Sequence, residues 1–143
     1  MKTILLMLLL AALCFAVYLR RSGYDAARWH VPPRDGVERE MRASFRTIRP
    51  MTAPAAEVLD AIMKAAEATP HTRLMSGSPE EGLMTFESRS PFWRFPDYTT
   101  VGVLDGKLSI FARSRYAGRD WGKNRERVET WLAVIGPLAG PPD

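Results

Sequence analysis

The stretch 98-YTTVGVLDGKLSIFARSRY-116 determines the architecture, because two strand-like runs flank a tight turn. Asp105-Gly106 is a strong two-residue hairpin signal, and pairing Leu104 with Lys107 fixes the register around it. One face then carries Val103 with Leu108, Val101 with Ile110, Thr99 with Ala112 and Asp97 with Ser114. The other face carries Gly102 with Ser109, Thr100 with Phe111 and Tyr98 with Arg113. The first face is the more apolar one and is expected to lie beneath helices.

The remaining elements follow from periodicity and from helix breakers on either side of this hairpin. Further strands are expected at 43–48, 72–77 and 83–90. The range 52–69 has an apolar stripe at helical spacing, with Thr52 as N-cap, Pro54 in the first turn and Pro70 after its end. A last helix is expected over about 121–135. This order predicts an α+β fold, with an antiparallel sheet of about four to five strands and two helices packed on one face.

The N-terminal stretch 3-TILLMLLLAALCFAVYL-19 contains seventeen uncharged residues. As a helix it would be about 25 Å long, at the short end of what spans a bilayer. Residues 1–21 are therefore predicted to form a transmembrane anchor, with a cleaved signal sequence as the alternative. Residues 22–42 are expected to be a basic juxtamembrane linker, and residues 43–143 a single α+β domain.

The basic excess of the chain lies beside this apolar segment. Residues 20–49 contain eight arginines and four acidic residues, whereas residues 50–143 contain eleven basic and twelve acidic residues. This charge balance argues against nucleic acid as a partner of the domain. Membrane lipid is the partner expected for the anchor. Because positive residues favour the inner side of a cell membrane, a single-pass protein with a cytoplasmic domain is predicted, with a periplasmic domain as the alternative.

Polar residues converge where the last helix is expected to meet the hairpin. Asn124 lies on the helix stripe that should face Ser114, Asp120 is the natural N-cap, and Arg127 is placed to reach a carboxylate. With Asp97 opposite Ser114, these side chains form either a hydrogen-bonded network that fixes the helix to the sheet or a site for a small anion.

A second set of polar residues is expected on the opposite face of the sheet. Alternation places Glu87 and Arg89 there, beside Arg113 and Arg115 and the rings of Tyr98 and Phe111. Cross-strand ion pairs and an arginine over an aromatic ring would account for this set. The alternative is a docking platform for an acidic head group or a partner protein, since arginine suits contacts with two oxygens at once.

Few residues in the chain carry catalytic or metal-binding chemistry. The only cysteine, Cys14, lies in the apolar segment, and no cofactor, metal or hydrolase pattern is found. Trp93 and Phe95 are expected in a packed loop, with an interfacial aromatic patch as the alternative.

The favoured function is a binding or accessory module that recognises an anionic ligand, lipid head group or acidic partner. The candidate ligand-binding residues are Arg89, Asp97, Arg113, Ser114, Arg115, Asp120, Asn124 and Arg127.

Two other functions stay open at this point. One is an enzyme that uses Asp97 or Asp120 with support from arginine. The other is a structural subunit of a membrane complex.

The motifs 28-RWHV-31, 88-SRS-90, 95-FPDY-98 and 113-RSRYAGRDWGKNRERVETWL-132 also resemble a known family. It is the widespread family catalogued as domain of unknown function 1499, and the likeness covers about residues 27–135. Many proteins of that family carry an N-terminal hydrophobic segment. The resemblance therefore implies a fold and membrane association, and it implies no particular activity.

Overall fold

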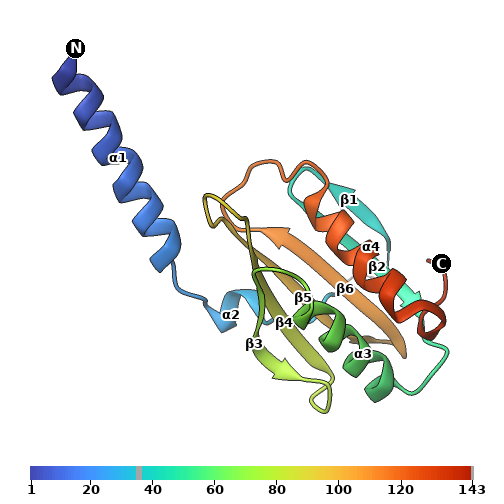
Figure 1. Ribbon diagram of the computed structural model, residues 1–143. Helices are drawn as coiled ribbons and strands as arrows, with labels where there is room; N and C mark the ends of the chain where they lie inside the picture. Colours follow the sequence, from blue (N-terminus) through green and yellow to red (C-terminus); the bar gives the residue numbers. More distant parts are fainter. Residues whose placement is uncertain (35–36, 143) are drawn as a thin grey trace.

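The computed structural model describes residues 1–34 and 37–142, and it consists of a long N-terminal helix followed by a sheet with helices on it (Figure 1). Residues 35–36 of the predicted linker and residue 143 of the predicted domain lie outside the described residues. The elements are α1 (Lys2–Arg21), α2 (Ala26–Trp29), β1 (Arg39–Met41), β2 (Ser44–Pro50), α3 (Ala55–Glu67), β3 (Thr72–Ser78), β4 (Leu83–Arg89), β5 (Pro96–Leu104), β6 (Lys107–Ser114), α4 (Lys123–Ile135) and the short 3-10 helix η1 (Gly136–Leu138).

The predicted hairpin and its register are confirmed. Leu104 pairs with Lys107, and each further pair follows in step to Asp97 opposite Ser114. Asp105 and Gly106 both have positive φ angles, 49° and 75°. Such a turn follows the natural twist of two paired strands, which is why Asp-Gly is favoured there.

The antiparallel sheet has six strands in the described residues, in the order β1-β2-β6-β5-β4-β3, where about four to five were predicted. The additional strand is β1, which pairs with β2 at the sheet edge. All three of its residues are exposed, so it has no alternation of apolar and polar side chains by which it could be recognised. Both β1 and α2 fall within the range 22–42 that was expected to be a linker.

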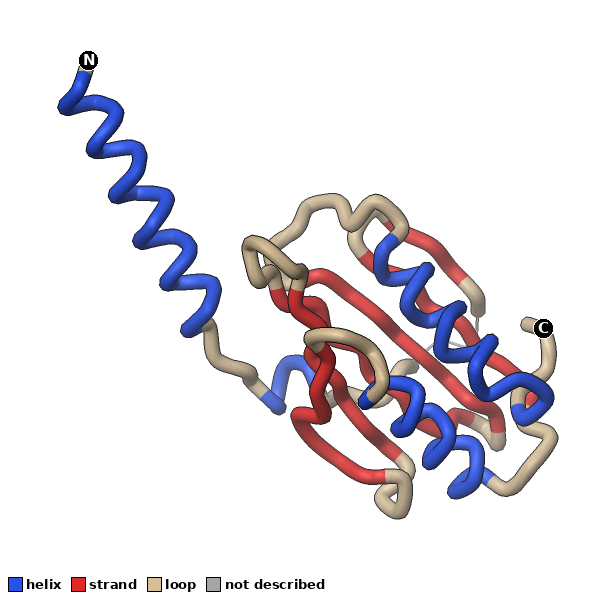
Figure 2. The backbone as a smooth tube through the Cα atoms, in the orientation of Figure 1, coloured by secondary structure: helices blue, strands red, loops and turns tan. Residues whose placement is uncertain are grey.

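Both α3 and α4 pack on one face of the sheet, as Figure 2 shows, and the hydrophobic core lies between these layers. Trp131 of α4 is fully buried, and its ring meets that of Phe86 edge-on at 5.4 Å. The prediction of Thr52 as the N-cap of the first of these helices was wrong, because Pro54 has that position. Thr52 instead binds the C-terminal segment, since its backbone N–H donates to the carbonyl of Leu138 at 3.1 Å.

The opposite face of the sheet is covered by the chain's own N-terminal segment. We call residues 22–31 the strap. Its residue Trp29 is buried, with its ring 4.5 Å from that of Tyr98. The carbonyl of Trp29 accepts hydrogen bonds from Thr100 Oγ1 at 2.8 Å and Arg113 Nη2 at 2.9 Å. The predicted face for these side chains is therefore right, and the strap, part of the range that was expected to be a linker, lies over Arg113 on that face.

The N-terminal helix α1 has a different environment from α3 and α4. Its apolar side chains are exposed along most of its length, and Leu19 is its one buried residue. By length and composition α1 is able to cross a membrane, a test that a signal sequence also passes.

Candidate functional site

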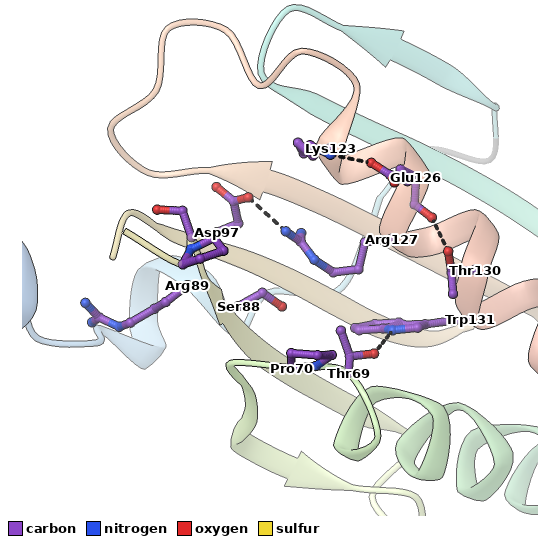
Figure 3. A pocket seen from close by; sticks show the side chains of 12 residues that line it. Thr69, Pro70, Ser88, Arg89, Asp97, Lys123, Glu126, Arg127, Thr130 and Trp131 are labelled. Atoms are coloured by element: carbon purple, nitrogen blue, oxygen red, sulfur yellow. Dashed lines mark hydrogen bonds and ion pairs between the residues drawn. The ribbon is translucent and has the colours of Figure 1, made fainter. Parts of the chain in front are cut away.

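A cleft of about 340 Å³ opens between the end of α3, the first half of α4 and the neighbouring ends of β4 and β5 (Figure 3). Polar side chains at its wall include Thr69, Ser88, Asp97, Lys123 and Arg127. The floor is apolar where Trp131 lies, and the Trp131 Nε1 group donates to Thr69 Oγ1 at 2.8 Å. A concave, partly apolar site with a few converging polar groups is the usual form of a ligand site.

Asp97 and Arg127 form the ion pair at the centre of this cleft. Arg127 Nη2 donates to Asp97 Oδ2 at 3.0 Å, and both side chains are mostly buried. Burial raises the pKa of Asp97 above its ordinary value. The charge of Arg127, together with the hydrogen bonds of Arg127 and Ser114, offsets only part of this effect. The carboxyl group of Asp97 therefore takes up a proton more readily than an exposed aspartate does.

Asn124 connects this ion pair to the sheet and to the loop before α4. Its side chain is fully buried, and its Nδ2 group donates to Ser114 Oγ at 3.1 Å and Asp120 Oδ2 at 2.6 Å. Its Oδ1 atom accepts from Arg127 Nη1 at 3.0 Å. The predicted convergence of Asp97, Ser114, Asn124 and Arg127 is thus confirmed, while their binding of a ligand stays a prediction.

Asp120 is a member of the same network but is not the N-cap that the sequence suggested. Trp121 and Gly122 have positive φ angles of 56° and 80°, so the chain turns once more and α4 begins at Lys123 with Gly122 as N-cap. The carboxylate of Asp120 accepts from the backbone N–H groups of Gly122 at 3.0 Å and Asn124 at 3.2 Å. These contacts stabilise the turn and the start of α4, and Asp120 does not line the cleft.

Arg89 borders the cleft, but its side chain leads away from it (Figure 3). The guanidinium group binds Glu87 through Nε at 2.8 Å and Nη2 at 3.0 Å, and Glu87 is only 1% exposed. Burial alone would raise the pKa of Glu87, but Arg89, Arg73 and Tyr98 together hold that pKa below its ordinary value. Arg89 also donates to the carbonyls of Leu19 at 2.8 Å and Ser22 at 3.3 Å.

Arg113 and Arg115 have similar partners on the same face as the Arg89 guanidinium. Arg113 binds the carbonyl of Trp29, as described above, and its guanidinium lies 5.0 Å from the ring centre of Trp29. Arg115 donates to the carbonyl of Gly23. The eight predicted residues therefore form two groups on opposite faces of the sheet. Asp97, Ser114, Asp120, Asn124 and Arg127 are together, whereas Arg89, Arg113 and Arg115 bind the N-terminal segment.

Some residues of the cleft were not found from the sequence. Ser88 had a signal, because alternation in β4 placed it toward the helices, where its Oγ lies 2.8 Å from Thr72 Oγ1. Thr69 and Lys123 had none, since their places depend on where α3 ends and α4 begins. No group of histidine, cysteine and acidic residues able to hold a metal ion is found in residues 1–34 and 37–142.

The raised pKa of Asp97 predicts a stability that falls as the pH rises. Between the ordinary value and the raised one, the folded protein holds more protons at this carboxyl group than the unfolded chain does, so the contribution of Asp97 to the free energy of unfolding decreases with increasing pH. Asp97→Asn removes this titration and should flatten that part of the profile. Urea unfolding at intervals between about pH 4 and about pH 8 measures it. Glu126→Gln is the matched control on the cleft rim, and an unchanged slope in Asp97→Asn would contradict the prediction.

Comparison with known proteins agrees with the resemblance seen in the sequence. Residues 29–135 match the model of one family, from the buried Trp29 of the strap to the last residue of α4. No curated protein and no solved structure matches the chain. The matched range contains the whole sheet, both covering helices and all eight candidate residues. The chain belongs to the family described as "Protein of unknown function (DUF1499)".

Proposed function

We propose that the protein is a single-pass membrane protein whose α+β domain is a binding module held beside the bilayer. The observation that carries this proposal is the contact between Arg89 and the end of α1, through the carbonyls of Leu19 and Ser22. The ring of Phe15, one turn earlier in α1, also meets that of Phe95 at 6.3 Å. Because the folded domain uses the last turns of α1, these contacts favour a retained anchor over a removed signal sequence.

Retention of α1 is tested on the full chain expressed in a bacterial membrane. The intact mass of the extracted protein should include residues 1–21, and the protein should stay in the membrane after an alkaline carbonate wash. A mature chain that begins after Ala16 would overturn the anchor. We place the domain on the cytoplasmic side because Arg20 and Arg21 outweigh Lys2. Activity of an alkaline phosphatase fused to the C-terminus would instead establish a periplasmic domain.

We infer that the ligand is anionic and that its acidic group enters the cleft beside Arg127 and Lys123. Lys123 is largely exposed at the cleft rim, and its present partner is the equally exposed Glu126 at 2.8 Å. Protonation of Asp97 would release Arg127 for an acidic ligand, and a second negative charge nearby would favour that protonation. Binding should therefore strengthen as the pH falls. The arginines that bind the strap are not needed for this site.

The binding proposal is tested by thermal unfolding of the full chain in detergent at constant ionic strength. Glycerol 3-phosphate and inorganic phosphate are the anionic probes, with glycerol as the uncharged control. A probe that binds the folded state raises the unfolding temperature. The phosphates should do so for the wild type, less for Lys123→Gln and not for Arg127→Gln. An equal rise in Arg127→Gln, or none in the wild type, would overturn an anion site in the cleft.

One observation favours a second candidate, an enzyme with Asp97 as general acid or base. Asp97 lies in the cleft with a raised pKa, as acid–base groups of active sites often do. Asp120 does not line this cleft, and its oxygens bind the start of α4. An activity that Asp97→Asn abolishes without lowering the unfolding temperature would support the enzyme over the binding module.

A further inference from the structure

The exposed aromatic side chains of the domain gather at one end. Among the described residues that follow α1, they are Phe92, 76% exposed, Trp93, 44% exposed, and Trp121, 78% exposed. Phe92 and Trp93 belong to the loop between β4 and β5, and Trp121 to the loop between β6 and α4. The two loops adjoin, because the start of β5 pairs with the end of β6. We call these three residues the aromatic end.

The aromatic end adjoins the last turns of α1. Phe95 of the β4–β5 loop packs on Phe15 of α1. Arg89, the last residue of β4, donates to the carbonyl of Arg94 in the loop and to that of Leu19 in α1. The second loop begins at Arg115, and the hydroxyl groups of Tyr116 and Tyr18 lie 3.3 Å apart. Both loops emerge at the end of the sheet on the side of α1, as Figure 2 shows.

These contacts set the depth of the loops relative to α1. Phe15 precedes the basic end of the helix, Arg20 and Arg21, by five and six residues. At about 1.5 Å per residue, this places Phe15 and the ring that touches it roughly 8 Å inside that basic end. If α1 spans a bilayer with its arginines at the head groups, the β4–β5 loop lies at the boundary between head groups and acyl chains. Tryptophan is enriched at that depth.

The charges around the aromatic end fit the same environment. Arg94 follows Trp93 directly, and the guanidinium of Arg119 lies 4.5 Å from the ring centre of Trp121. With Arg20 and Arg21 of α1, four arginines accompany the three exposed rings. Apolar rings beside cations that can meet anionic head groups are the composition of a lipid-binding surface.

We propose that the aromatic end inserts into the interface of the bilayer that holds α1, so that membrane lipid is its partner. The proposal rests on the membrane anchoring proposed above, and it adds a second point of contact between the domain and the bilayer. The domain is then fixed in orientation, with the end of the sheet that carries the cleft toward the lipid. The side chains of Phe92, Trp93 and Trp121 are left exposed by the rest of the protein, and in this proposal lipid covers them.

The test uses tryptophan fluorescence of the full chain, reconstituted in vesicles of phosphatidylcholine and phosphatidylglycerol. The lipids carry bromine near the head-group end of their acyl chains, and bromine quenches only rings that it touches. Trp93→Phe and Trp121→Phe each remove one reporter and keep an aromatic ring. The double variant retains only the buried Trp29 and Trp131 and is the internal control.

Bromolipid should quench the wild type, each single variant less, and the double variant little or not at all. Aqueous acrylamide should have little effect on Trp93 and Trp121 in vesicles. If the chain floats with the vesicles but these two residues are quenched by acrylamide and not by bromolipid, the inference fails while the anchor stands. If the chain does not float, the anchor fails, and the inference with it.

Discussion

Replacing Arg89 by alanine should lower the free energy of unfolding by about 3 to 5 kcal/mol at neutral pH. Arg89 and Glu87 are both buried on the strap side of the sheet, and the guanidinium makes two hydrogen bonds to the carboxylate. Without Arg89 the charge of Glu87 stays buried with less compensation, which is the costly case for a buried ion pair. The variant also removes the hydrogen bonds from Arg89 to the carbonyls of Leu19 and Ser22. Urea unfolding in detergent measures the loss.

Two controls separate the ion pair from general loss of packing. Arg73 binds the same carboxylate at 3.0 Å but is largely exposed, so Arg73→Ala should cost clearly less. Arg89→Met combined with Glu87→Gln removes both charges and retains an acceptor for Tyr98, so it should lose less than Arg89→Met alone.

The pH dependence gives a further check of the same prediction. Because the pKa of Glu87 is lowered in the folded protein, its contribution to stability is present above its ordinary value and is lost as the pH falls below it. The cost of Arg89→Ala should therefore shrink in acid. A cost that does not change with pH would mean that packing, not charge, determines the loss.

Asn124→Ala should lower the free energy of unfolding by about 3 kcal/mol, and Asn124→Asp by more. The amide joins Ser114, Asp120 and Arg127 in a fully buried position, so its removal leaves several groups without a partner, at about 1 to 3 kcal/mol each before relaxation. In Asn124→Asp, a carboxylate oxygen replaces the nitrogen that lies 2.6 Å from Asp120 Oδ2, and like charges then repel. Chemical unfolding of both variants at neutral pH measures the two losses.

A double-mutant cycle extends this prediction to the cleft. Arg127 donates to both Asn124 and Asp97, so the two residues share one bridging partner. The combined variant with Asp97→Ala and Asn124→Ala should lose clearly less than the sum of the single variants. If the two losses of free energy were strictly additive, Asp97 and Asn124 would not interact through the network. Thr130 is exposed at the cleft and its hydroxyl binds only the carbonyl of Glu126 among the contacts described, so Thr130→Ala is the control and should change little.

The hairpin register was predictable because local chemistry and the burial pattern agree there. Asp105-Gly106 fixes the turn, and a shift by one residue would turn Val101 and Ile110 away from the helices. With the register known, the meeting of Asp97 with Ser114 and of Asn124 with Ser114 follows from alternation and helical spacing. The regular geometry of turns and helices is enough to predict that part of the site.

The strap was not predictable, because its residues carry no period. Trp29 lies beside charged and polar residues, so the sequence gives it the character of a linker, and only the three-dimensional structure shows it buried on Tyr98. The positions of Arg113 and Arg115 were right by alternation, but their partners are backbone carbonyls, which have no signature in sequence. The late start of α4 likewise depends on a positive φ at Trp121, a residue type that rarely adopts one.

The strap has a consequence for the order in which the newly made chain folds. It leaves the ribosome directly after α1, but its partners Arg113 and Arg115 follow more than eighty residues later, 84 residues beyond Trp29 and 92 beyond Gly23. The strap therefore lacks its two arginine partners Arg113 and Arg115 until β6 and the residue after it have been synthesised. Contacts so distant in sequence form slowly, because a long loop must close before they yield any stabilisation. With α1 as the proposed anchor, its insertion into the membrane would precede completion of the domain, and the sheet would close over a segment already tethered to the bilayer.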